Sequence, residues 1–82
     1  MTGASISTAT IRARIMESAR ACRESDERHH GVTAEGWRTL ADFRMVAGRG
    51  RYVETTRVAR ALEDLVRVGE LEVDALRGWR SR

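Results

Sequence analysis

Apolar residues recur with helical spacing near the start of the chain. The positions i, i+4, i+8 and i+11 are taken by Ile11, Ile15, Ala19 and Cys22. This spacing places one apolar stripe along a helix, and Ser7 or Thr8 has the side chain expected of its N-cap. The next residues, 25–31, are polar and end in a glycine. We therefore expect the helix to end soon after Cys22.

A second helix is expected to follow at once. Thr33 is a suitable N-cap, and Val32 and Trp37 have the spacing of a hydrophobic staple around it. Glu35 falls in the first turn, where the helix dipole favours a carboxylate. The residues that would share one face are Trp37, Leu40, Ala41 and Arg44. We expect Trp37 to lie in the core and Gly48 to end the helix.

The third helix has the clearest pattern in the sequence. Its apolar stripe is formed by Val58, Ala61, Leu62, Leu65 and Val66. The stripe has the width of a helix face that packs on a core. We therefore expect a helix over residues 55–68, with Glu54 or Thr55 as N-cap and Gly69 after its end.

Beyond this glycine the pattern changes from helical to extended. Leu71 and Val73 alternate with acidic residues, which is the period of a strand. Gly78 can turn the chain back, but so few residues follow that we expect only a stunted second strand. The sequence therefore predicts one mainly α domain with a small β-hairpin over residues 8–82, preceded by a flexible segment, 1–7.

The stretch from Val58 to Leu71, VARALEDLVRVGEL, resembles the passage from recognition helix to first wing strand in winged helix-turn-helix DNA-binding domains. The resemblance covers roughly residues 8–82. It implies a three-helix winged helix-turn-helix fold, in which the third helix lies in the major groove of DNA and the hairpin forms the wing. It also implies that residues in the first turns of the third helix reach the base edges.

Charge is distributed unevenly along the chain. The composition, 41% hydrophobic and 33% charged in 82 residues, fits one globular domain and excludes a membrane or fibrous protein. Residues 38–60 hold six arginines against two acids, a net charge of +4, whereas residues 61–75 hold one arginine against five acids, a net charge of −4. All fifteen basic residues are arginine, whose planar fork suits phosphates and guanine edges.

Eight residues are candidate DNA contacts: Arg49, Arg51, Thr55, Thr56, Arg57, Arg60, Arg77 and Arg80. Two arginines near a helix N-terminus are disfavoured by the helix dipole, by about 0.3–1 kcal/mol each when exposed. A bound anion would offset this cost and would account for their position. We expect the loop arginines to meet phosphates and those near the C-terminus to extend the same cationic face. The alternative is a solvated face, in which Arg60 pairs with Asp64 and Glu63 with Arg67.

Other chemistry has little support in the sequence. His29, His30 and Cys22 lack the spacing of a structural zinc site, and there is no nucleophile–base constellation or phosphate-binding glycine loop. We expect no enzyme activity, metal or cofactor. A single cysteine, no long apolar stretch and no secretory signal favour a cytoplasmic protein without a membrane partner.

The first functional hypothesis is duplex DNA binding by a small transcription regulator, or by a recombination or replication accessory of phage or plasmid type. One such domain buries only about 600–1,000 Å² on DNA, so we expect a homodimer or a cooperative array, formed through the first helix or the acidic strand. The alternative is a protein-interaction module on the same scaffold, in which the acidic run 63–74 docks on a basic partner without DNA.

Overall fold

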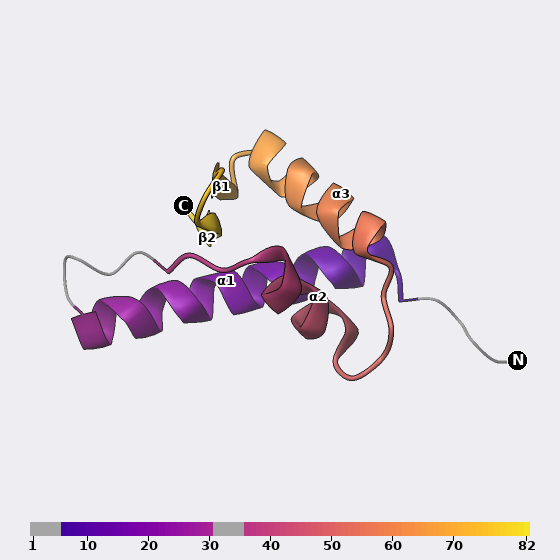
Figure 1. Cartoon of the computed structure of the whole chain (residues 1–82), viewed down its shortest axis with the longest axis horizontal. Helices are drawn as coiled ribbons and strands as arrows, with labels where there is room; N and C mark the ends of the chain where they lie inside the picture. The colour runs from indigo at the N-terminus through magenta and orange to yellow at the C-terminus, as the bar shows by residue number, and fades with distance from the viewer. Residues whose placement is uncertain (1–5, 31–35) are drawn as a thin grey trace, which may run out of the picture.

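The computed structural model describes residues 6–30 and 36–82, and the side chains of residues 6–25 and 36–82. The elements are α1 (Thr8–His30), α2 (Leu40–Gly48), α3 (Thr55–Arg67), β1 (Leu71–Asp74) and β2 (Gly78–Ser81). Figure 1 shows α1 running along the molecule, with α3 and the hairpin on one side of it and α2 crossing it. The predicted mainly α fold with a small β-hairpin is confirmed, and the layout is compatible with a three-helix winged-helix domain.

The core lies where the three helices and β1 meet. Its largest fully buried side chains are Phe43, Ile11, Ile15, Leu62, Leu71 and Val58. The apolar stripe predicted for the third helix packs here, with Val66 only partly buried. Ile6, which falls in the segment predicted to be flexible, is partly buried against the same core. The strong period of α3 is therefore a consequence of packing against α1, α2 and β1.

The first helix is longer than predicted. It begins as expected, because the Ser7 Oγ accepts a hydrogen bond from the Thr10 N–H at 3.1 Å. It continues to His30, so the prediction that it ends soon after Cys22 is wrong. Residues 23–30 contain neither glycine nor proline, so their sequence holds no residue that would stop a helix. The end of the apolar period therefore did not mark the end of the helix.

The second helix begins later than predicted, at Leu40. Its N-cap is Thr39, whose Oγ1 accepts from the Asp42 N–H at 3.4 Å, while the Asp42 carboxylate accepts from the Thr39 N–H at 3.1 Å. This reciprocal capping box satisfies two N–H groups at once and fixes the start of the helix. The predicted signals at residues 32, 33 and 35 lie outside the described residues.

The segment before α2 pairs with strand β2 of the hairpin through a single β-bridge. Gly36 has a positive φ of 68°, and Arg38 makes a β-bridge with Trp79, with N–H to carbonyl distances of 2.8 and 2.9 Å. Gly78 lies directly against this bridge, since a Cβ at Gly78 would collide with the Arg38 carbonyl group. The bridge ties the chain ahead of α2 to the hairpin.

The predicted buried face of α2 and the predicted core position of Trp37 are both wrong. Trp37 is half-buried and lies outside the core, with the guanidinium carbons of Arg80 and Arg77 at 4.5 and 5.5 Å from its ring centroid. Ala41 and Arg44 are exposed. The side of α2 that packs on the core carries Leu40, Phe43 and Ala47.

The hairpin is complete, so the expectation of a stunted second strand is wrong. β1 and β2 pair antiparallel over four residues each, from Leu71 opposite Ser81 to Asp74 opposite Gly78. Gly78 has a φ of 107°, which a residue with a Cβ rarely adopts, and it lets a short turn connect the strands.

No helix within the described residues is long and apolar enough to cross a membrane.

Candidate nucleic-acid interface

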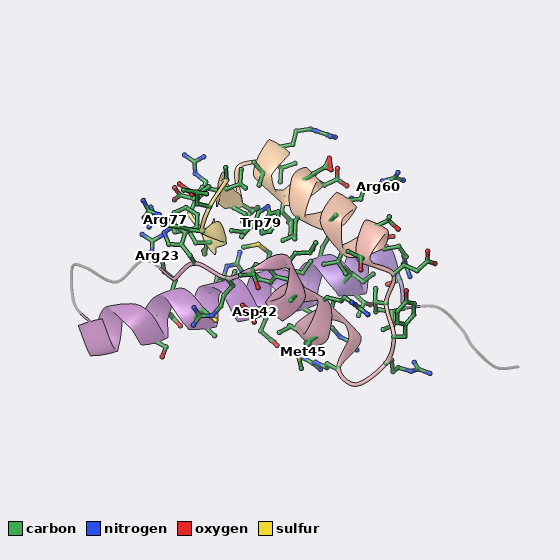
Figure 2. The ribbon with its side chains drawn as sticks, in the orientation of Figure 1. Arg23, Asp42, Met45, Arg60, Arg77 and Trp79 are labelled. Atoms are coloured by element: carbon green, nitrogen blue, oxygen red, sulfur yellow. The ribbon has the colours of Figure 1, made fainter. Side chains whose placement is uncertain are left out.

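The eight candidate residues occupy two separate regions of the molecule. Six of them are found at the start of α3 and in the loop that leads to it, namely Arg49, Arg51, Thr55, Thr56, Arg57 and Arg60. The other two, Arg77 and Arg80, belong to the hairpin. In Figure 2 the labelled Arg60 and Arg77 lie toward opposite ends of the molecule. The six residues of α3 and its preceding loop therefore lie in one region of the molecule, and the two hairpin arginines lie in another.

The start of α3 forms a cationic notch with the start of α1. The notch, about 190 Å³ in volume, is lined by Thr8, Thr56, Arg57, Arg60 and Ala61. Its lining holds two guanidinium groups and two hydroxyls and no carboxylate. The N-cap of α3, Glu54, makes no side-chain hydrogen bond to the first turn. The Arg57 N–H donates to the Glu54 carbonyl at 3.0 Å, and the dipole of α3 adds positive potential at this end of the helix.

Arg60 is the most available guanidinium of this notch. It is exposed, and among the described residues it makes no ion pair or hydrogen bond. The alternative pairing with Asp64 is not found, because that carboxylate is held by Arg12 at 2.6 Å and by Arg67 at 3.4 Å. Arg57 is half-buried and donates to the Ile6 carbonyl at 2.6 Å. Arg57 therefore also fixes the segment that enters α1, whereas Arg60 remains open to a ligand.

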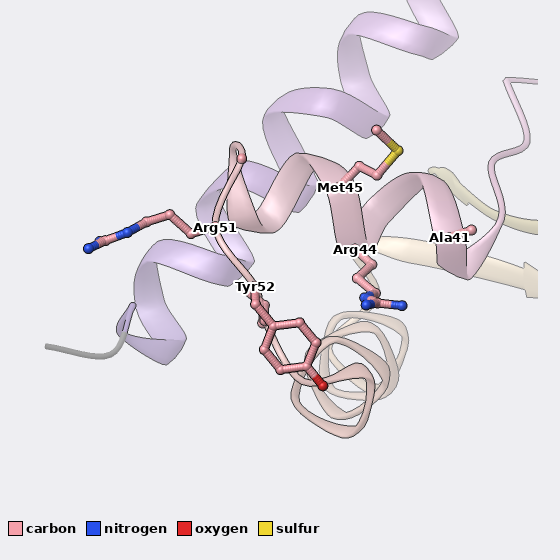
Figure 3. A pocket seen from close by; sticks show the side chains of 7 residues that line it. Ala41, Arg44, Met45, Arg51 and Tyr52 are labelled. Carbon is pink, nitrogen blue, oxygen red and sulfur yellow. The ribbon is translucent and has the colours of Figure 1, made fainter. Parts of the chain in front are cut away.

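The two loop arginines differ in how far they are engaged. Arg49 follows α2 as its C-cap in the left-handed region, with φ 46° and ψ 51°, and its guanidinium lies 3.0 Å from the Glu17 carboxylate. Arg51 is exposed and makes no ion pair within the described part of the chain. Figure 3 shows the Arg51 side chain directed away from Arg44. Arg51 and Arg60 are thus the two candidate arginines left open to a ligand.

The hairpin arginines are engaged within the chain. The Arg80 Nε lies 3.1 Å from the Glu72 carboxylate and that of Arg77 lies 4.0 Å from Asp74, while both guanidinium groups lie against the Trp37 ring. The hydrogen bond from Arg80 lowers the pKa of Glu72. Backbone N–H groups at residues 76 and 77 lower the pKa of Asp74. Both acids are therefore held in the ionised form, and they neutralise much of the positive charge of the hairpin.

A second feature, a groove on the outer side of α2, was not predicted from the sequence. It has a volume of about 400 Å³, and its lining includes Ala41, Arg44, Met45, Arg51 and Tyr52 (Figure 3). Met45 and Tyr52 are 77% and 75% exposed, and the Arg44 guanidinium lies 5.4 Å from the Tyr52 ring centroid. Two large exposed side chains beside the loop glycines were the only sequence signal of this groove.

Comparisons with protein-family models, with curated proteins and with solved structures find no match to this chain. The class of the protein is therefore defined by its fold, three helices followed by an antiparallel hairpin, which is compatible with a winged-helix layout. Among the described residues, no group of three or more histidine, cysteine, aspartate or glutamate side chains could hold a metal ion. The cationic start of α3 and the groove on α2 are two features of the described surface that could bind a ligand.

Proposed function

We propose that this protein binds duplex DNA by placing the first two turns of α3 in the major groove. The observation that carries the proposal is the pair of exposed arginines, Arg51 and Arg60, which have no ion-pair partner among the described residues. They flank the start of a helix whose opposite face is buried in the core. An exposed helix face with arginine and threonine in its first turns is the arrangement that reads base edges in helix-turn-helix proteins.

The roles of the individual residues follow from their positions. Thr56 and Arg60 lie one turn apart on the exposed side of α3 and would face the bases, with Thr55 beside them. Arg51 would meet the phosphates next to the groove, and Arg57 would hold a phosphate at the notch. A regulator, or an accessory of recombination or replication, would use such a domain as one unit of a larger assembly on DNA.

The hairpin arginines have a smaller part in this proposal. Arg77 and Arg80 already meet carboxylates and the Trp37 ring, so moving them to DNA would cost those contacts. The alternative function, docking of the acidic run on a basic partner, has less support. Four of its five acids, Asp64, Glu70, Glu72 and Asp74, are paired with arginines of the same chain.

The proposal is tested by fluorescence anisotropy on genomic DNA fragments at two salt concentrations, comparing Arg60→Ala, Arg51→Ala and the control Arg67→Ala. Arg67 lies near the far end of the same helix, is exposed, and among the described residues pairs only with Asp64. Arg60→Ala should reduce the preference for a selected fragment by roughly 5–150-fold, or about 1–3 kcal/mol. Arg51→Ala should weaken binding to all fragments alike, and it should reduce the slope of log affinity against log salt concentration by about one unit.

Two results would contradict the proposal. One is binding that disappears at moderate salt with no preferred fragment, since this is the behaviour of a nonspecific cation. The other is an equal loss of preference in Arg60→Ala and Arg67→Ala, which would mean that only net charge matters.

A further inference from the structure

The large apolar side chains that remain exposed are concentrated in two places. Among the described residues they are Met45, Tyr52, Val68, Val73 and Leu76. Two of these flank the α2 groove, and two lie at the tip of the hairpin, which we define as residues 73–77. A single exposed apolar side chain is ordinary, but paired apolar residues beside a groove and on a protruding turn are typical of contact surfaces.

The hairpin tip presents an apolar side chain beside a fixed carboxylate. Leu76 is 96% exposed and Val73 is 52% exposed. The Asp74 carboxylate accepts hydrogen bonds from the N–H groups of Leu76 and Arg77 at 2.8 and 3.0 Å, so the turn has a defined shape. The Arg77 guanidinium is turned onto the Trp37 ring, and its Nε lies 4.0 Å from the Asp74 carboxylate, a long and partly exposed pair. The tip is therefore a rigid protrusion that places a leucine beside a carboxylate, which would exchange its long contact with Arg77 for a partner's arginine.

The α2 groove has the complementary properties. Met45 and Tyr52 provide apolar walls, and the two charged residues of its lining are both arginines, Arg44 and Arg51. No carboxylate contributes to this lining. A groove of about 400 Å³ has room for a leucine side chain, and Arg44 beside it can receive a carboxylate.

The two surfaces cannot meet within one chain. Figure 1 shows the hairpin and the loop that follows α2 on different sides of the molecule, with α1 between them in this view. A contact between them must therefore join two copies. A contact between different patches of identical chains is heterologous, and it leaves one free groove and one free tip at the ends of every assembly.

We propose that copies of this protein associate head to tail, with the hairpin tip of one copy seated in the α2 groove of the next. Leu76 enters between Met45 and Tyr52, and Asp74 approaches Arg44. One leucine and one ion pair form a small contact, which gives weak and transient association in solution. If the proposed DNA binding holds, copies on one DNA molecule have a high effective concentration, so the same contact makes binding cooperative.

Sedimentation velocity of the free protein over a range of concentrations tests the association, without DNA. The variants are Leu76→Ser in the tip, Met45→Ser in the groove, and the matched control Val68→Ser, an exposed apolar residue outside both surfaces. We expect the wild type and Val68→Ser to form species larger than dimers as concentration rises. Leu76→Ser and Met45→Ser should each remain monomeric, and circular dichroism should show that all of them keep their helices.

An equimolar mixture of the two monomeric variants gives the sharpest result. Met45→Ser keeps an intact tip and Leu76→Ser keeps an intact groove, so one contact can form between them and no further copy can add. We expect heterodimers and nothing larger. A mixture that stays monomeric, a wild type that stays monomeric at millimolar concentration, or a Val68→Ser variant as defective as Leu76→Ser would overturn the proposal.

The outcome is separable from that of the DNA-binding proposal. Leu76→Ser should bind a single DNA site as the wild type does and lose only cooperativity on longer DNA. If DNA is not bound at all, the association of the free protein is still measured. If DNA is bound but the free protein never associates, only the head-to-tail contact is refuted.

Discussion

Replacing Gly78 with alanine tests how the hairpin is attached to the rest of the fold. Gly78 has a φ of 107°, and a Cβ at this position would collide with the Arg38 carbonyl group. The substitution therefore does two things at once. It imposes a positive φ on a residue with a side chain, and it forces apart the bridge between Arg38 and Trp79.

The two effects can be given magnitudes from the structure. A positive φ costs a residue with a Cβ about 1–2 kcal/mol. The bridge consists of two backbone hydrogen bonds of 2.8 and 2.9 Å, each contributing about 0.5–1.5 kcal/mol net. Gly78→Ala should therefore destabilise the fold by about 2–5 kcal/mol. Gly69→Ala is the matched control, because Gly69 has a φ of 84° and a Cβ there meets nothing within 4 Å.

Thermal unfolding followed by circular dichroism separates the two contributions. Gly69→Ala should be destabilised only by the cost of the positive φ, so the free energies of unfolding of the two variants should differ by about 1–3 kcal/mol, the contribution of the bridge. For a domain of this size each kcal/mol corresponds to about 4–8 °C in Tm. Gly78→Ala should therefore melt at least about 4 °C below Gly69→Ala. Equal Tm values for the two variants would show that the bridge contributes nothing and that the reasoning is wrong.

Two further predictions concern the loop and the hairpin. Arg49 has a backbone conformation in the left-handed region, so Arg49→Gly should be more stable to urea than Arg49→Ala by roughly 1 kcal/mol. Both variants lose the exposed ion pair with Glu17, so this pair does not affect the comparison. Equal stability of the two variants would show that the backbone at Arg49 is not strained. The hydrogen bond from Arg80 lowers the pKa of Glu72 below its ordinary 4.5. Ionised Glu72 therefore stabilises the fold at a pH above 4.5, and this contribution is lost as the pH falls through the lowered pKa. Glu72→Gln should therefore have a lower Tm than wild type near neutral pH, and the difference should shrink in a pH series well below 4.5; a constant difference would refute this assignment.

The third helix was predicted well because its signals are local. Its apolar stripe reports burial directly, and Gly69 marks its end within two residues of the observed position. Arg57 and Arg60 were placed correctly on the helix by the same period, because a residue's face follows from its spacing to the stripe. The identity of the element and the residues it exposes are thus encoded within one short segment.

The errors arose where a contact between distant segments decides the structure. The segment directly before α2 is held by the bridge between Arg38 and Trp79, and Trp79 is about forty residues away in the sequence. The capping box of Thr39 and Asp42 was present in the sequence, but the stronger-looking signals upstream competed with it. Trp37 was misplaced for the same reason, since its neighbours are the hairpin arginines rather than the core.

The candidate site shows the same limit. Periodicity placed Arg57 and Arg60 off the apolar stripe of α3, but it could not show that Arg57 is half-buried or which arginines are neutralised. Asp64 is held by Arg12 from α1 and Glu70 by Arg20, and these pairs join residues about fifty positions apart. The alternative i, i+4 pairing of Arg60 with Asp64 is not formed, because Arg12 and Arg67 hold that carboxylate.

The ion pairs also explain why Arg12, Arg20 and the hairpin arginines are less available than Arg51 and Arg60. Asp64, Glu70, Glu72 and Asp74 lie in the later turns of α3, just after it or in the hairpin, and arginines of the same chain meet each of them. No such carboxylate reaches Arg51 or Arg60 among the described residues. Most of these pairs are partly exposed, so each adds little to stability, but they neutralise several arginines of α1 and the hairpin and leave Arg51 and Arg60 unpaired. The proposed DNA-binding surface is therefore determined as much by the placement of the acids as by that of the arginines.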